Sequence, residues 1–243
     1  MHIVTLYNHK GGVSKTTSTY NLAHYLVSIG KRVLLVDADS QCNMTELALG
    51  KIIADLDLEA SQTGEIKELP GTSLLDILSP RIKGDTPSID VKSIEPVTLR
   101  PGLDLIRGSV DLTSIEDDLA EAHVQRFATR THLMRTYVSI GDFLVRLADQ
   151  KKYDYIFIDV GPSSGALTRS FFLVCDAFFL PIAPDRFNVQ AVKTLSSIVS
   201  RLIAEHNQIR ADYENFSLPV RLGRPVFLGA IAQFFKMYKE PVP

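Results

Sequence analysis

Short apolar runs alternate with helical patterns along most of this chain, and this alternation limits its fold more than any other feature. Several runs are apolar throughout, as expected of strands buried on both faces of a parallel sheet. The candidate strands are residues 2–7, 32–37, 103–107, 153–159, 177–182 and 226–233. The sequence therefore predicts an α/β fold, a doubly wound, mostly parallel β-sheet with helices on both faces.

Three apolar stripes at helical spacing predict the covering helices. The first contains Leu22, Ala23, Leu26 and Ile29 and is followed by Gly30, a residue that readily ends a helix in the left-handed conformation. The others run through Leu133, Tyr137, Ile140, Leu144 and Leu147, and through Val189, Val192, Leu195, Ile198, Val199, Leu202 and Ile203.

The 243 residues are expected to form a single domain over positions 1–243. Prolines and glycines interrupt the pattern between about residues 50 and 101, which we interpret as a less regular insertion with short helices. The chain stops directly after an apolar strand, where a doubly wound domain normally adds a covering helix, and this leaves a truncated C-terminus open.

Composition argues against a strongly basic nucleic-acid-binding protein, a disulfide-rich secreted protein and a membrane-spanning protein. With 26 basic and 28 acidic side chains the net charge is -2, so any binding to DNA requires a local basic patch. Cys42 and Cys175 lie far apart and form no metal-ligand spacing, which favours a reducing cytoplasm. The N-terminus lacks the pattern of a secretion signal, and no apolar stretch is long enough to span a membrane.

The strongest functional motif is the segment Lys10-Gly11-Gly12-Val13-Ser14-Lys15-Thr16-Thr17, which follows the first strand and opens the first helix. Such a loop places backbone N–H groups and the positive end of a helix around phosphate oxygens. Lys15 adds a positive charge for the outer phosphates, and the Thr16 hydroxyl is placed to ligate magnesium. Thr17 is expected to help hold an inner phosphate. The sequence therefore predicts a site for ATP and Mg²⁺.

This loop resembles that of the deviant-loop partition and positioning ATPases, the ParA/MinD family, which reads Lys-Gly-Gly-x-Gly-Lys-Thr-Thr. The chain is most similar to the partition (ParA/Soj) branch. Residues 36–43 resemble the family's first switch, 155–163 its acidic strand end and second switch, and 102–112 its middle strand and the helix that follows. The departures are Ser14 for the last loop glycine, Ser40 for the switch proline and Gly161 for a second-switch proline. Serine at position 14 is strained if the loop requires a positive φ there, and tolerated if it does not.

The resemblance implies how the site would work. Lys15 and a magnesium ion held by Thr16, and through water by Asp159, would neutralise the β- and γ-phosphate oxygens. Asp37 is expected to support the outer shell of the metal. Asp39, just past the second strand, is the candidate for positioning the attacking water.

The resemblance also implies that the chain forms a homodimer and binds DNA and a partner protein. Lys10 would reach across a homodimer to the nucleotide of the partner subunit, so that ATP controls dimerisation. Partition members bind DNA without sequence preference as dimers, and Lys193, Arg201 and Arg210 are the candidate contacts here. Gln233 follows the last strand, where this fold often recognises a base. We expect slow turnover accelerated by a ParB-like partner, and a cytoplasmic protein that associates with the nucleoid when ATP is bound.

Other functions remain open at this point. A MinD-like membrane-positioning ATPase would need a C-terminal amphipathic helix. The 243 residues contain none, and a truncated C-terminus leaves this alternative open, although stable membrane association is not expected. A nucleotide-gated DNA-binding regulator would bind ATP and hydrolyse little of it. An iron–sulfur reductase subunit would need cysteine ligands with suitable neighbours, which neither cysteine has.

Overall fold

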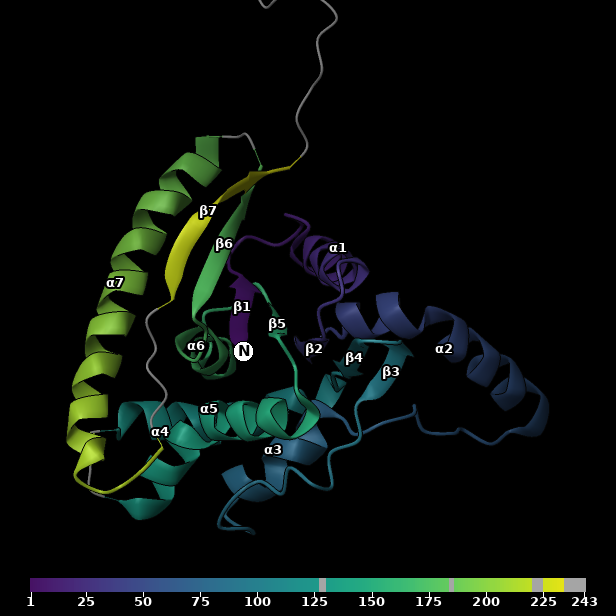
Figure 1. Ribbon diagram of the computed structural model, residues 1–243, viewed down its shortest axis with the longest axis horizontal. Coiled ribbons are helices and arrows are strands. Elements are labelled where there is room, and N and C mark those ends of the chain that lie inside the picture. Colours follow the sequence, from purple (N-terminus) through teal and green to yellow (C-terminus); the bar gives the residue numbers. More distant parts are fainter. Residues whose placement is uncertain (127–129, 184–185, 220–224, 234–243) are drawn as a thin grey trace, which may run out of the picture.

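The computed structural model describes residues 1–126, 130–183, 186–219 and 225–233, with the backbone alone for 186–194. Its centre is a seven-stranded sheet in the order β3-β4-β2-β5-β1-β6-β7 (Figure 1). All neighbouring strands are parallel except β3 and β4. The strands are β1 (His2–Leu6), β2 (Val33–Ala38), β3 (Val97–Arg100), β4 (Leu103–Ile106), β5 (Tyr155–Val160), β6 (Ala177–Ile182) and β7 (Val226–Ala232). The predicted fold class is confirmed.

The strands are buried on both faces because successive side chains enter different cores. Ile3 and Leu34 belong to a large cluster shared with the helices after α2, whereas Val4 and Leu35 belong to a second cluster with α1 and α2. Helices therefore cover both sides of the sheet (Figure 1). They are α1 (Lys15–Ser28), α2 (Asn43–Thr63), α3 (Leu74–Ile82), the 3-10 turn η1 (Val110–Ile115), α4 (Glu116–Val124), α5 (Thr131–Lys151), α6 (Ala166–Leu173) and α7 (Arg186–Glu214).

The order of the central strands brings the functional segments together. β2, β5 and β1 lie side by side, and Asp37 at the end of β2 is the register partner of Asp159 at the end of β5. The loop after β1 emerges at the same edge because parallel strands share their carboxyl ends. Segments far apart in sequence thus meet at one place on the sheet.

All six candidate strands and the three candidate helices are present, and the structure adds elements that the sequence patterns missed. Residues 50–101 contain most of α2, all of α3 and the antiparallel strand β3. Strand β3 was missed because Pro96 and Pro101 flank its four residues, a pattern that only a short edge strand tolerates. No helix among the described residues is both long and apolar enough to cross a membrane.

Candidate functional site

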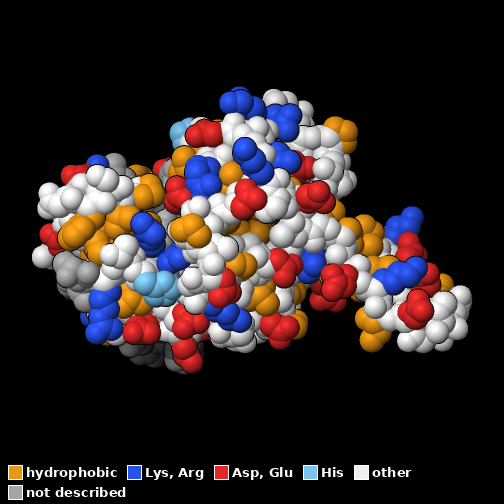
Figure 2. All heavy atoms as spheres, turned by 90° about the horizontal axis from the view of Figure 1, so that it is seen from below, with side chains coloured by type: hydrophobic (Ala, Val, Ile, Leu, Met, Phe, Trp, Pro, Cys, Tyr) orange, Lys and Arg blue, Asp and Glu red, His pale blue; other side chains and the backbone are white. Residues whose placement is uncertain are grey.

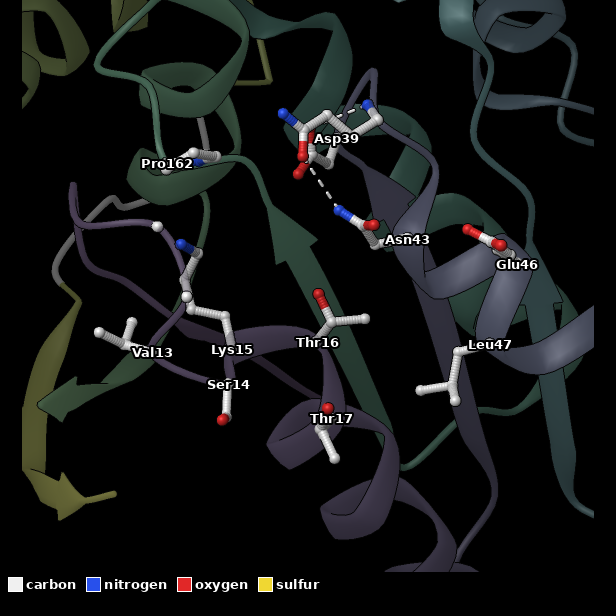
Figure 3. Close-up of a pocket in the computed structure, with 13 residues that line it drawn as sticks. Val13, Ser14, Lys15, Thr16, Thr17, Asp39, Asn43, Glu46, Leu47 and Pro162 are labelled. Carbon is white, nitrogen blue, oxygen red and sulfur yellow. Dashed lines mark hydrogen bonds between the residues drawn. The ribbon is translucent and has the colours of Figure 1, made fainter. Parts of the chain in front are cut away.

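An open cavity of about 580 Å³ lies between the loop after β1 and the first turns of α2 (Figure 3). In Figure 3 the loop and the start of α1 form one side, and Asp39, Asn43, Glu46 and Leu47 lie across from them. Residues from three regions line it, namely Gly11, Gly12, Val13, Ser14, Lys15, Thr16, Thr17, Asp39, Gln41, Asn43, Glu46, Leu47 and Pro162. The predicted phosphate loop and first switch therefore face one another across a shared cavity.

The backbone of the loop is left-handed at two positions. Gly12 has a φ of 71°, and Ser14, directly before α1, has φ 58° and ψ 33°. The Ser14 side chain makes no capping hydrogen bond to the helix. An L-residue in this region is typically strained by about 1–2 kcal/mol, so the strained alternative for Ser14 is the one that the structure adopts.

Lys15 folds back over the loop. Its Nζ donates to the backbone oxygens of Asn8, at 3.2 Å, and Lys10, at 3.3 Å, and the residue is only 8% exposed. Burial lowers its pKa, and the carboxylates of Asp159 and Asp39 oppose that shift. A partly desolvated ammonium beside a glycine loop is well suited to pair with a phosphate oxyanion.

Asp159 is the most unusual carboxylate of the site. It is 1% exposed, and neither carboxylate oxygen has a hydrogen-bond partner among the described residues. Burial raises its pKa to about 7, and the carboxylates of Asp37 and Asp39 add to the rise. The Thr16 hydroxyl and the Lys15 ammonium oppose it, although the hydroxyl does not reach hydrogen-bond geometry with either oxygen.

These features fit a magnesium ion with its water shell. Mg²⁺ takes few protein ligands, keeps several waters and uses phosphate oxygens in nucleotide sites. An unpaired buried carboxylate beside a threonine hydroxyl supplies what such a site requires, and the described residues contain no cluster of three or more His, Cys, Asp or Glu that would hold a metal alone. The predicted roles of Thr16 and Asp159 therefore remain chemically consistent predictions.

The Asp37 carboxylate, unlike that of Asp159, accepts several hydrogen bonds. Its Oδ2 accepts hydrogen bonds from the Thr45 backbone N at 2.8 Å and from the Thr45 hydroxyl at 2.6 Å, and its Oδ1 accepts from the Asp39 backbone N at 3.3 Å. Thr45 Oγ1 in turn accepts from the Gly108 backbone N at 2.8 Å. Burial raises the pKa of Asp37 to about 6. In this structure its carboxylate anchors the start of α2 to the sheet.

Asp39 lines the cavity and contacts both switch segments. Its Oδ1 accepts a hydrogen bond from the Gln41 backbone N at 3.0 Å. The same oxygen lies 3.0 Å from where a Cβ on Gly161 would be, so a larger residue at Gly161 would press on the carboxylate. The absence of a side chain at position 161, where the family commonly has proline, leaves room for Asp39.

The remaining predicted residues lie outside the cavity lining. Lys10 is exposed at the loop entrance, and its backbone N donates to Asn8 Oδ1. Gln233 donates from Nε2 to the Ser18 hydroxyl on α1 at 3.1 Å. Arg201 is exposed on α7, and Arg210 forms an ion pair with Glu214 at 3.3 Å. The side chain of Lys193 lies outside the described residues.

Sequence reasoning missed several residues of the site. Asn8 supports the loop by accepting from the Lys15 ammonium and by donating from Nδ2 to the Pro181 backbone oxygen at 2.8 Å. Asn43, Glu46 and Leu47 line the cavity from one face of α2. Their spacing of three and four residues directly after the first switch was the available signal, had a helix been predicted there.

Fold and site together define the class of protein, a P-loop nucleotide-binding protein, because a glycine loop leads from a central parallel strand into a helix beside two strand-end aspartates. Comparison with known proteins narrows the class. The chain belongs to the ParA-type family of P-loop ATPases, and its residues 1–211 match the family model described as an AAA domain.

Several relatives carry partition names. The sporulation initiation inhibitor protein Soj of Bacillus subtilis is 31% identical over 99% of this chain and 83% of its own length. The chromosome partitioning protein ParA of Caulobacter vibrioides is 30% identical over 83% of this chain, which spans 63% of that protein. Among solved structures, a protein of Corynebacterium diphtheriae is 30% identical with a TM-score of 0.80, covering 96% of this chain and 82% of its own.

A plasmid partition protein of Borrelia burgdorferi bound to AMPPNP has the same fold at a TM-score of 0.60. It is 21% identical and covers 98% of this chain and 92% of its own. At this level of identity the likeness shows the fold alone.

Proposed function

We propose that this chain is a partition ATPase that binds Mg-ATP in the cavity between the loop at residues 10–17 and α2. The observation that carries the proposal is Asp159, a buried carboxylate with no hydrogen-bond partner among the residues that the structure describes, next to Thr16 and the folded-back ammonium of Lys15. Such an arrangement is costly in an empty site and becomes favourable when a cation and phosphate oxygens are present. The names of the relatives support the partition role.

Hydrolysis requires neutralised phosphate charge and an oriented water. Thr16 and Asp159 would hold the magnesium ion, which neutralises charge on the β- and γ-phosphate oxygens. Lys15 exchanges its contacts with backbone carbonyls for contacts with phosphate oxygens. Asp39 orients the attacking water from the cavity wall, and Asp37 supports this geometry through its contacts with Thr45.

ATP-dependent assembly extends this proposal. Lys10 would contact the nucleotide of a partner subunit, so the ATP-bound state favours the homodimer. A dimer doubles the basic residues available to DNA phosphates, among them Lys193, Arg201 and Arg210, and makes DNA affinity depend on nucleotide and salt. A ParB-like partner would accelerate ATP hydrolysis, and the chain would then dissociate from DNA.

The binding step is tested by calorimetry of the full chain with Mg-ATP. The variant Lys15→Ala should weaken binding at least tenfold, equivalent to about 1.4 kcal/mol. Lys31→Ala is the matched control, because Lys31 is an exposed lysine outside the cavity lining. No heat of interaction for folded parent protein refutes the proposal.

The catalytic step is tested by separating affinity from turnover in Asp39→Ala. Because Asp39 would act on the water, we expect kcat to fall about 100-fold, within the typical range for a lost acid–base or orienting group, with little change in Kd for Mg-ATP. A variant that loses affinity and keeps its turnover contradicts the assigned role.

The assembly step is tested by a titration of non-specific duplex DNA with ATP, ADP and no nucleotide, at two salt concentrations. Binding should require ATP and weaken steeply with salt. Equal DNA affinity with ATP, with ADP and without nucleotide would contradict the partition role and would support only nucleotide binding.

A further inference from the structure

Helix α2 projects from the body of the molecule. It extends away from the sheet in Figure 1 and forms the projection at the right of Figure 2. Its 21 residues correspond to a length of about 31 Å. Its fully buried residues, Met44, Thr45 and Leu49, all lie in its first two turns. Most of the helix beyond Gly50 is therefore surrounded by solvent.

One face of α2 carries a seam of three apolar residues and one lysine, which begins beside the nucleotide cavity and runs onto the projection. Leu47 and Leu58 are 46% and 60% exposed, and Lys51 and Ala54 between them are also exposed. Successive members of the seam are separated by four, three and four residues, which places all of them on one helix face. The opposite face carries Leu49 and Ile53, which pack against the second core cluster.

This seam is complementary to itself. The spacing of four, three and four reads the same in both directions, so two antiparallel copies of α2 place Leu47 opposite Leu58 and Lys51 opposite Ala54. Lys51 and the exposed Asp55 lie on the same flank of the seam, and in an antiparallel pair the same flanks face each other. Each Lys51 would then meet an Asp55 of the other copy, twice in a symmetric dimer.

We propose that α2 is a self-association surface, and that its occupant is α2 of a second copy of this chain in antiparallel orientation. Exposed apolar side chains at coiled-coil-like spacing are stabilised when a matching seam covers them. Among the paired residues only Leu47, at one end of the seam, lines the nucleotide cavity, whereas Lys51, Ala54, Asp55 and Leu58 do not. The pairing therefore needs no nucleotide along most of its length. It provides a contact separate from ATP-dependent dimerisation.

Analytical ultracentrifugation of the full chain without nucleotide tests the proposal. The parent chain should show a monomer–dimer equilibrium, and Leu58→Glu should raise its dissociation constant at least tenfold. Ile66→Glu is the control, because Ile66 is 92% exposed and lies beyond α2, off the seam. A parent chain that stays monomeric, or equal effects of the two variants, overturns the proposal.

A charge exchange tests the orientation. Lys51→Glu alone should weaken the dimer, and adding Asp55→Lys in the same chain should restore it, because both contacts are then reversed. A double variant no tighter than the single variant contradicts the predicted flank contact.

Disulfide trapping tests the register in a Cys42→Ser background, since Cys175 is buried. Leu47→Cys and Leu58→Cys proteins, prepared separately and mixed, should form a cross-linked heterodimer. Neither should cross-link alone, because residues 11 positions apart are offset by about 16 Å along antiparallel helices. Cross-linking in the separate proteins equal to that in the mixture refutes the register.

Discussion

Replacing Ser14 with glycine isolates the strain of the phosphate loop. The left-handed conformation at φ 58° typically costs an L-residue about 1–2 kcal/mol. Glycine avoids that cost but loses about 0.5–1 kcal/mol through its more flexible unfolded chain. The difference between these two ranges is centred on about 0.75 kcal/mol. We therefore expect Ser14→Gly to stabilise the protein by about that amount, which raises Tm by roughly 1.5–3 °C for a chain of this size.

The assay is thermal unfolding of the protein without nucleotide, with Ser14→Ala as the matched control. Alanine keeps the Cβ that causes the strain and removes only the hydroxyl, which makes no capping hydrogen bond. Its Tm should therefore not rise. The Kd for Mg-ATP of Ser14→Gly should stay close to that of the parent, because the loop already has this conformation. Equal stabilisation by alanine and glycine would refute the reasoning.

Three further substitutions test the surrounding site. Asp159→Asn should stabilise the nucleotide-free protein, relative to the parent, increasingly as pH rises from about 4 to about 7. The folded pKa of Asp159 is raised to about 7, so over this range the carboxyl ionises in the unfolded chain and stays protonated in the folded one, which lowers the stability of the parent. Thermal unfolding against pH measures the difference, and parallel profiles would contradict it. Gly161→Ala should displace Asp39 and lower kcat with little change in Kd for Mg-ATP, measured by phosphate release and calorimetry; an unchanged kcat would contradict this. Thr45→Val removes the hydroxyl that donates to buried Asp37 and accepts from the Gly108 backbone N, and it keeps only the backbone N–H bond to Asp37. It should cost about 2–4 kcal/mol in urea unfolding. A cost below about 1 kcal/mol, the net worth of one ordinary hydrogen bond, would contradict the anchoring role.

Six of the seven strands and the helices α1, α5 and α7 could be predicted because their apolar patterns reflect their burial. Helix α2 could not, since much of it lies away from the core and its outward face carries both apolar and charged residues. An apolar periodicity indicates a helix when one face is apolar and the other polar, and the two faces of a projecting helix differ little in polarity. The antiparallel strand β3 escaped for a different reason, because two prolines flank it.

The phosphate loop and the strand-end aspartates were identifiable because their chemistry depends on local sequence next to a strand. Which carboxylate would be free for a metal was not identifiable. Asp37 and Asp159 both end apolar strands and are register partners. Only the structure shows that Thr45 hydrogen-bonds Asp37 and that no described residue hydrogen-bonds Asp159, because this difference depends on the start of α2.

Two local conflicts lie together at the candidate nucleotide site. Ser14 is strained in the loop, and Asp159 is buried without a hydrogen-bond partner in the described part of the chain, although each belongs to a well-packed α/β fold. Conflicts of this kind persist where function offsets their cost. A bound magnesium nucleotide would neutralise Asp159 and occupy the loop that Ser14 holds open, so ligand binding should recover stability that the empty site lacks. The site is therefore organised for its ligand at the expense of the empty state.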